Sequence, residues 1–417
     1  MIKEIKVEEF NRLARTFPNV TFYQTSNWAS LKSFTGWKPL YLGYYENNKL
    51  LGIGLFLLRS MPIFDSFLAY CPRGYLINYF DFEQLERFNK ELMSYLKNEN
   101  VFELIIDPYL PLNQRDINGD LVPNSFDNTY IVEELKKIGY KHTGYNLNYE
   151  NLQPRFLFRL PLKNKTYEEI EKDFKKETKR RVNKKNFLAI SVRELKKEEI
   201  TDFKDLMEDT SKRRSFIDRP LTYYKQMYDT LHDDGILRYM GAYIDVDKCR
   251  ENISIEKNKI KKRIEKLSEH KENNIGKLKE ENVTLNSLNN LLKQLNICEK
   301  EKGKNILLSV VCLLTYGKEA IMLLAGNDED YLQHFNSSNI IVSELIKLSI
   351  NEGYDYYNFY GITGNFDPNN KNYGLYTYKK QYGGEVLELI GQFEYTIQKP
   401  LKNIYDMMLK IYKMSKK

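Results

Sequence analysis

"FLFRLPL" (residues 156–162) and "LAISVREL" (188–195) are short apolar runs with the β-branched and aromatic content typical of strands. Each is followed by a longer, highly charged stretch with helical spacing, "TYEEIEKDFKKETKRRVNKKN" (166–186) and "KEEITDFKDLMEDTSKRR" (197–214). Strands that alternate with helices predict a mixed α/β (α+β) fold.

The same alternation continues on both sides of this stretch. Residues 1–150 combine strand-like runs such as "LLGIGLFLL" with the helical pattern "DFEQLERFNKELMSYLKNEN", and we interpret them as a first α/β unit. Residues 151–246 and 304–398 form a second unit, followed by a C-terminal helix over 399–417. No sequence repeat relates the two units, so this division depends on the order of the predicted elements alone.

Residues 247–303 interrupt the second unit. They contain no proline and are rich in lysine, glutamate and asparagine, and their apolar residues recur at steps of three and four. The pattern breaks at Gly276 and so predicts an antiparallel helical hairpin. Two interpretations remain open: the hairpin packs or dimerises, or it reaches a large partner.

Composition limits the function classes. Lysine and arginine outnumber acidic residues by 64 to 57, giving a net charge of +7 and a mild preference for phosphate-bearing partners. Four cysteines lie far apart without a CxxC pair, and the four histidines lack ligand spacing, so we expect reduced thiols and no metal site. The first residues and the longest apolar runs predict neither a signal peptide nor a membrane span, and hence a soluble cytoplasmic protein.

Two basic segments are candidates for phosphate binding. Residues 172–186 carry eight basic and two acidic side chains, which suit either a solvated helix face or contact with an RNA backbone. Arg219 precedes Pro220 at a predicted helix start, where it either binds phosphate or anchors a loop.

Two further candidates lie at strand ends. Asp107 ends the strand in "IIDPYLP", where it either stabilises a turn before Pro108 or accepts a proton. Residues 358–386 have the glycine and asparagine content of a loop, yet carry seven aromatic rings and the pair Lys379 and Lys380. We interpret them as a strand ending in "FYG", followed by a flexible, aromatic-lined loop, "ITGNFDPNNKNYG", that closes over a peptide substrate ahead of Lys379.

The motifs together resemble a known family. "FYQTSNWASLKSFTGW", "IIDPYLP", "TKRRVNKKN", "MEDTSKRRSFIDRPLTYY", the inserted hairpin and "TYKKQYGGEVLELIGQF" occur in the order found in the Fem family of peptidoglycan aminoacyltransferases. The resemblance covers nearly the whole chain and is strongest to the branch with a coiled-coil arm.

The resemblance implies two GNAT-like acyltransferase domains, with the hairpin as an antiparallel coiled-coil arm inserted in the second. It implies transfer of an amino acid (glycine, or serine or alanine) from aminoacyl-tRNA to the stem peptide of a peptidoglycan precursor. The precursor would be lipid II or UDP-MurNAc-pentapeptide, and the product an interpeptide bridge. No cofactor is implied beyond the aminoacyl-tRNA co-substrate, and peripheral contact with the inner face of the membrane is compatible with such a role.

The resemblance also implies site residues. Lys379 matches the lysine needed for transfer, and Asp107 an aspartate proposed as base. Lys32 and Arg219 match residues that hold the precursor's diphosphate. The other implied substrate-binding residues are Trp37, Tyr223 and Tyr378, and the basic segment contributes Lys176, Lys179 and Arg180 for tRNA. "IMLLAGND" has leucines where relatives often carry tyrosines, so one hydrogen bond to the precursor is in doubt.

The chemistry of transfer is consistent with these residues. The attack of an amine on an ester needs positioning and stabilisation of an oxyanion, for which Lys379 is suited, as it is for gripping a tRNA phosphate. Whether Asp107 removes the amine proton or the leaving ribose hydroxyl receives it directly stays open. If residues 379–380 belong to a strand, the two lysines point to opposite faces.

Two other function classes fit less well. An acetyl-CoA-dependent acetyltransferase of the GNAT fold should show a Q/RxxGxG/A loop, but Gly52 and Gly54 lie inside an apolar strand. A non-catalytic RNA-binding or scaffold protein would explain the basic segment and the hairpin. It would not explain the aromatic residues ahead of Lys379.

Overall fold

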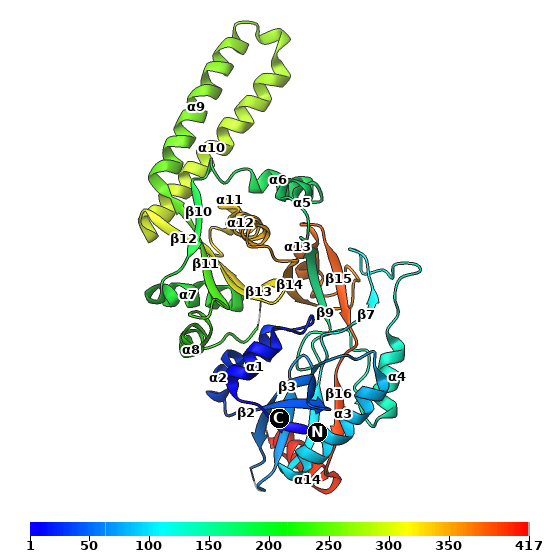
Figure 1. Ribbon diagram of the computed structural model, residues 1–417. Coiled ribbons are helices and arrows are strands. Elements are labelled where there is room, and N and C mark those ends of the chain that lie inside the picture. Colours follow the sequence, from blue (N-terminus) through cyan, green and yellow to red (C-terminus); the bar gives the residue numbers. More distant parts are fainter. Residues whose placement is uncertain (63, 215, 416–417) are drawn as a thin grey trace.

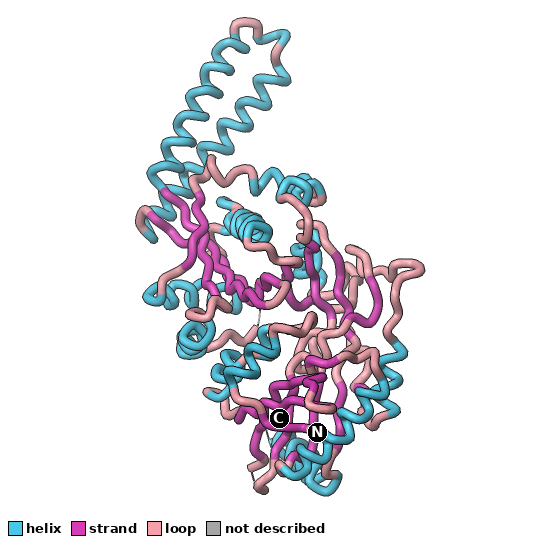
Figure 2. The backbone as a smooth tube through the Cα atoms, in the orientation of Figure 1, coloured by secondary structure: helices cyan, strands magenta, loops and turns pink. Residues whose placement is uncertain are grey.

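The computed structural model describes residues 1–62, 64–214 and 216–415. These residues form two mixed β-sheets flanked by helices, and a long helical arm projects from the second sheet (Figures 1 and 2). The predicted α/β fold class is confirmed.

The first sheet is built mainly from the N-terminal part of the chain. Its strands lie in the order β1-β2-β3-β4-β6-β16-β8, and β5 pairs with β3. Their bounds are β1 Ile2–Glu4, β2 Lys38–Glu46, β3 Lys49–Ser60, β4 Phe67–Cys71, β5 Leu76–Ile77, β6 Val101–Ile106, β8 Lys141–His142 and β16 Phe393–Thr396. The helices of this part are α1 Val7–Ala14, α2 Ser26–Ser33, α3 Phe82–Asn98 and α4 Thr129–Lys137.

The second sheet has the order β10-β11-β12-β13-β14-β9-β15-β7. Its strands are β7 Pro111–Gln114, β9 Phe156–Pro161, β10 Ile190–Glu194, β11 Leu237–Asp245, β12 Asn305–Tyr316, β13 Glu319–Asn327, β14 Tyr356–Ile362 and β15 Glu385–Leu389. Its helices are α5 Tyr167–Lys172, α6 Lys176–Val182, α7 Ile200–Arg214, α8 Leu221–Leu231, α11 Leu332–Phe335, α12 Ser337–Asn351 and α13 Tyr373–Lys380.

Each sheet contains a parallel strand pair joined by a segment with an amphipathic or apolar helix. In the first sheet α3 lies between the parallel strands β4 and β6, and in the second α12 lies between β13 and β14. α3 begins after Asp81, whose side chain accepts a hydrogen bond from the Gln84 backbone N–H at 3.0 Å. The recurrence of this arrangement explains why element order alone predicted two similar units.

The two sheets exchange strands. β7, from the first part of the chain, pairs with β15 in the second sheet, whereas β16 lies between β6 and β8 in the first. The chain passes from β15 to β16 through Gly391, whose φ of +99° favours glycine. At these two strands the structure therefore differs from a division into residues 1–150 and 304–398.

The basic stretch 166–186 was predicted as one helix, and this prediction is wrong, because the chain breaks between α5 and α6. Phe174, in the break, is buried with its ring edge-on to Tyr382, at a centroid distance of 5.2 Å. The Lys175 backbone N–H donates to the Gln381 carbonyl at 2.9 Å, and the extended ψ of Lys175 (143°) interrupts the helix.

The arm consists of α9 (Val246–Ser268) and α10 (Ile275–Lys302), which pack side by side in antiparallel directions (Figure 1). The 23 residues of α9 give a length of about 35 Å at 1.5 Å per residue. Ile260, Leu288 and Leu295 of the predicted apolar seam are buried between the helices and the second core. Arg263 and Glu281 form an ion pair across the arm at 2.9 Å.

Lys379 and Lys380 lie in a helix and not in a strand, so the condition under which the two side chains would point to opposite faces is not met. Residues 373–380 form the helix α13, because Tyr376 and Lys379, three positions apart, are both buried on its inner face. The preceding loop is tied to its surroundings: the Gly364 backbone N–H donates to the Leu147 carbonyl at 2.7 Å, and the Phe366 ring lies 5.0 Å from that of Tyr376.

The C-terminal helix α14 (Lys399–Ser415) packs beside the start of β6. Within the described ranges, no helix combines the length and the apolar character needed to cross a membrane.

Candidate functional site

Three cations gather where the first sheet approaches α8. Lys32 lies in the last turn of α2, with Nζ 4.5 Å from the centroid of the Trp28 ring. The α2 helix is oriented by Thr25, whose hydroxyl accepts from the Trp28 backbone N–H at 3.1 Å. Arg219, just before Pro220 and α8, lies 5.4 Å from the Tyr223 ring.

Arg59, near the end of β3, is the third cation. Its guanidinium lies 4.6 Å from the Trp37 ring and donates to the Thr35 carbonyl at 2.8 Å. Burial, together with the charges of Arg219 and Arg59, lowers the pKa of Lys32 to about 8. Within the described residues, none of the three cations forms an ion pair with a carboxylate, so they offer an uncompensated positive site for an anion.

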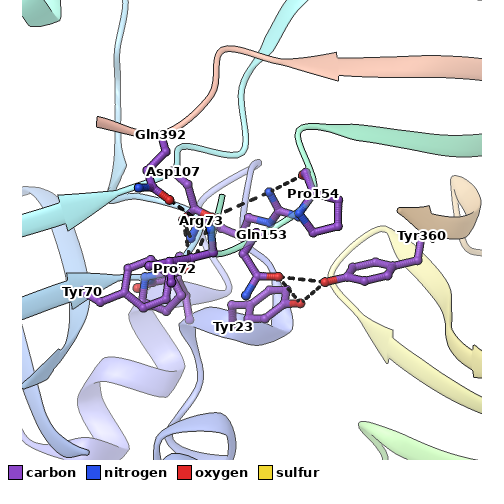
Figure 3. A network of polar contacts seen from close by, with 11 residues as sticks. Tyr23, Tyr70, Pro72, Arg73, Asp107, Gln153, Pro154, Tyr360 and Gln392 are labelled. Carbon is purple, nitrogen blue, oxygen red and sulfur yellow. Dashed lines mark hydrogen bonds and ion pairs between the residues drawn. The ribbon is translucent and has the colours of Figure 1, made fainter. Parts of the chain in front are cut away.

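A second group of side chains forms a polar network between the two sheets (Figure 3). The hydroxyls of Tyr23 and Tyr360 lie 2.6 Å apart, and both donate to Gln153 Oε1, at 3.0 and 2.8 Å. Tyr23 precedes α2, whereas Tyr360 belongs to β14 of the second sheet. The network therefore joins the two parts of the molecule at one point.

Asp107 lies at the centre of the buried end of this network. Its carboxylate accepts from the Tyr70 hydroxyl at 3.1 Å and from the Arg73 backbone N–H at 2.7 Å, and Arg73 Nη1 lies 3.9 Å away. Burial raises the pKa of Asp107 to about 6, an effect that the charge of Arg73 and these hydrogen bonds oppose.

The turn that carries Arg73 is constrained. Arg73 has φ +60° and Gly74 φ +75°, and a Cβ at Gly74 would lie 2.8 Å from Pro108 Cα. This close approach holds the Arg73 guanidinium between the rings of Tyr23 and Tyr109, at 5.7 and 5.6 Å. Asp107, at the end of β6, thus stabilises the Arg73–Gly74 turn at the end of the neighbouring strand β4.

Lys379 is buried beneath a bulge of β14. Its Nζ donates to the carbonyls of Tyr360 and Gly361, at 3.2 and 2.7 Å, and burial lowers its pKa to about 7. Tyr360 has φ +65°, a left-handed conformation that is rare for an aromatic residue. Lys379 thereby holds the backbone that carries the Tyr360 hydroxyl into the network.

The cations and the network form one continuous region. The Trp28 ring, over which Lys32 Nζ lies, is 4.8 Å from the Tyr23 ring. The Trp37 ring is 6.4 Å from the Tyr70 ring. A small cavity of about 10 Å³, lined in part by Arg73, Glu319 and Tyr360, lies beside the network. That volume is about one water molecule.

The structure thus brings Lys32, Trp37, Arg219, Tyr223 and Asp107 into one region and joins Lys379 to it through Tyr360. Tyr378 lies elsewhere: its hydroxyl donates to the Ser338 carbonyl at 3.3 Å, and its ring packs 5.9 Å from that of Tyr382. Leu323 and Leu324, in "IMLLAGND", are half-buried against the same core as Tyr223.

The candidate tRNA residues lie on α6. Lys176 is exposed, Lys179 donates to the Lys172 carbonyl at 2.8 Å, and Arg180 pairs with Glu177 at 3.0 Å. The Thr178 hydroxyl donates to Gln381 Oε1 at 2.9 Å, so the basic helix docks two residues beyond Lys379.

Sequence analysis missed Tyr23, Arg73, Gln153 and Tyr360. Tyr23 and Tyr360 lie inside quoted motifs, and "RG" at 73–74 is a turn signal, but their contacts join positions up to 337 apart. Among the described residues, no group of three or more histidine, cysteine, aspartate or glutamate side chains is arranged to hold a metal ion.

Comparisons with known proteins give consistent matches. The FemAB family profile matches residues 5–410. Aminoacyltransferase FemA of Staphylococcus aureus, from strains N315 and NCTC 8325 / PS 47, is 30% identical over 420 residues, covering 98% of this chain and of each relative. A solved structure, the crystal structure of FemX, superposes with a TM-score of 0.77 at 24% identity, over 97% of this chain and 99% of the other.

Proposed function

Since this chain belongs to the FemAB family and is an aminoacyltransferase, we propose that it transfers an amino acid from aminoacyl-tRNA to the stem-peptide amino group of a peptidoglycan precursor. The precursor is lipid II or UDP-MurNAc-pentapeptide, and the transferred residue, glycine, serine or alanine, begins or extends an interpeptide bridge. The observation that carries the proposal is the group of three unpaired cations beside a tyrosine network that joins both sheets.

The precursor's diphosphate fits the three cations. Lys32, Arg59 and Arg219 supply positive charge without a carboxylate partner in the described part of the chain, so a dianion would replace repulsion with attraction. Trp37 and Tyr223 lie against the arginines and would limit the space beside the phosphates. From this anchor the stem peptide would run toward the tyrosine network.

The reaction exchanges one acyl bond for another. The precursor amine attacks the ester carbonyl of the aminoacyl-tRNA, a C–N bond forms and the ester C–O bond breaks. One proton passes from the amine to the leaving ribose hydroxyl, directly or through a base. Positioning and a stabilised oxyanion supply most of the acceleration in such a transfer.

We assign the proton-accepting role to Asp107 and a positioning role to Lys379. A carboxylate with a pKa near 6 is ionised at neutral pH and still a useful base. Lys379 donates hydrogen bonds to two backbone carbonyls, those of Tyr360 and Gly361. It would therefore act by positioning Tyr360 and not by contacting the ester.

The tRNA would approach along α6 and the arm. α6 carries the exposed Lys176 and is joined to Gln381, near Lys379, while the segment after α6 meets the arm through Asn252, which donates to the Phe187 carbonyl at 3.0 Å. A basic surface next to the arm suits a polyanion that is read by shape and charge.

The direct test is incubation of the chain with pools of charged tRNA and with lipid-linked or UDP-linked precursor, followed by mass measurement of the product. We expect a single added residue, whose mass identifies the donor. If no acceptor gives a tRNA-dependent product, the proposal is wrong.

A binding test addresses the anion site. Lys32→Met and Arg219→Met should each weaken precursor binding by about 1–3 kcal/mol, the range for a charge-assisted contact, with a loss that shrinks at high salt. Isothermal titration with a precursor analogue lacking the diphosphate is the control, since it should be indifferent to both changes. Equal losses with that analogue would mean that the residues only support the fold.

A further inference from the structure

The C-terminal helix α14 is amphipathic along its whole length. Its inner side packs on the first sheet: the Tyr405 ring lies 5.1 Å from that of Phe102, and Lys402 pairs with Glu103 at 3.1 Å. The Asp406 carboxylate accepts from Lys402 Nζ at 2.7 Å. The first half of the helix is therefore attached to the body of the protein.

The outer side of α14 exposes apolar side chains. Met407, Ile411 and Met414 are 56%, 55% and 68% exposed, and their spacing of four and three residues places them in one stripe. Lys410 and Lys413, also exposed, lie along the edge of this stripe. An apolar stripe bordered by lysines is the pattern of a helix that lies in the headgroup region of a bilayer.

The end of β3 and the start of β4 lie at the same end of the first sheet. Ser60 pairs with Phe67 and Phe67 with Val101, while the Gln398 side chain, just before α14, donates to the Val101 carbonyl at 3.0 Å. Phe64, close in sequence to the start of β4, is 42% exposed. Figure 1 shows α14 at the end of the molecule opposite the arm.

This end of the sheet also adjoins the cation group. Arg59 precedes Ser60 in β3 and pairs with Leu68 of β4, next to the Ser60–Phe67 pair that leads to Val101 and Gln398. A diphosphate bound by the cations would therefore contact, through Arg59, the end of the first sheet on which α14 packs.

We propose that α14, together with Phe64, is a membrane-contact surface that places the chain on an anionic phospholipid bilayer. The inference rests on the proposed function and refines it, because it favours the lipid-linked precursor: a diphosphate at the bilayer surface would reach Lys32 and Arg219 while its lipid stays in the membrane. The lysines complement an anionic surface. Because the exposed apolar stripe covers only one side of the helix, the helix would lie on the membrane and not cross it.

The test measures co-sedimentation of the full chain with vesicles of phosphatidylcholine containing about 30% phosphatidylglycerol, against vesicles of phosphatidylcholine alone. We expect binding to the anionic vesicles that weakens with salt. The triple variant Met407→Gln, Ile411→Gln, Met414→Gln should bind at least tenfold more weakly, and glutamine preserves helix propensity. The matched control is Ile255→Gln with Val283→Gln, two exposed apolar positions on the arm, which should bind as the unmodified chain does.

Other occupants of the stripe give distinct results. If the stripe instead held a second copy of this chain, light scattering would show a dimer that the triple variant dissociates, with no effect on vesicle binding. That result, or an unmodified chain that ignores anionic vesicles, would overturn the inference. Circular dichroism and thermal melting check that the triple variant is folded.

Activity separates this inference from the proposed function. The triple variant should lose at least tenfold in transfer to lipid-linked precursor in vesicles, and keep transfer to the UDP-linked precursor or to a short-chain lipid analogue. Transfer to every acceptor without vesicle binding would refute the membrane surface and leave the function standing. Vesicle binding without transfer to any acceptor would refute the proposed function and leave the membrane surface standing.

Discussion

At the scale of single residues, Asp107 is the group whose protonation should govern transfer. Its pKa of about 6 predicts that kcat/KM rises as pH increases through 6. The Tyr70 hydroxyl donates to the ionised form and lowers this pKa, so Tyr70→Phe should move the acid limb upward by about 0.5–1 pH unit.

A pH–rate profile of both proteins checks this shift. Tyr140→Phe is the control, because the Tyr140 hydroxyl is buried in the same unit but pairs with Tyr75 and not with Asp107. An acid limb that is absent near pH 6, or unmoved in Tyr70→Phe, would argue that Asp107 only stabilises the Arg73 turn.

Lys379 gives a second prediction, on stability. Its folded pKa of about 7 lies below the model-peptide value of 10.5, so the unfolded chain binds more protons between these values. The free energy of unfolding should therefore contain a contribution that increases with pH from about 7, by up to about 1.4 kcal/mol per unit, and Lys379→Met should remove it.

Urea unfolding at pH 7, 8 and 9 measures this difference. Lys380→Met is the matched control: the Lys380 side chain donates to Asn118 at the surface, and its removal should not alter the pH dependence. Lys379→Met should also lower turnover by about 100-fold with little change in precursor affinity, since the Tyr360 bulge loses its support and misplaces the network. Full turnover in Lys379→Met would contradict the positioning role.

At the scale of elements, sequence reasoning succeeded where hydrophobic pattern alone decides the structure. The apolar runs became β3 and β12, and the steps of three and four became α9 and α10. It failed at the break between α5 and α6, because Phe174 is held by Tyr382, more than 200 positions away. It also did not predict α13, because this helix follows a segment rich in glycine and asparagine and is stabilised by tertiary burial of Tyr376 and Lys379.

The arm offers an element-scale experiment. Residues 262–285 can be replaced by a short Gly/Ser loop, which retains the buried layer of Ile260 and Leu288 and the base of the arm. If the arm docks tRNA, KM for aminoacyl-tRNA should rise at least fivefold while precursor affinity is unchanged. Steady-state kinetics with each substrate varied in turn provide both values, and an unchanged KM together with an altered mass in solution would favour the dimerisation role.

At the scale of the whole molecule, the exchange of strands couples the two sheets. Phe393 of β16 is fully buried in the core of the first sheet, although the strand that precedes it in sequence, β15, belongs to the second. Phe393→Ala should lower the free energy of unfolding by about 3–5 kcal/mol, the cost of emptying a buried aromatic site. Hydrogen exchange should show the first loss of protection in β6 and β8.

Phe359→Ala, a buried aromatic of the second core, is the comparison variant, and it should first expose β9 and β14. Equal loss in both sheets for both variants would mean that the chain unfolds as a single unit. This coupling was beyond sequence reasoning, because Phe393 and Ile106 are 287 positions apart (393 minus 106) and nothing in either segment specifies the other.

The position of β16 also constrains how the protein is made. Synthesis runs from the N-terminus, so the ribosome has released β6 long before β16 exists; at about 5–20 residues per second, 287 residues take about 15–60 s. During that interval the nascent first sheet has an open edge at β6, the kind of edge that pairs with other chains. The N-terminal half must therefore wait for the C-terminal segment, and a chaperone that shields the β6 edge would protect it until translation ends.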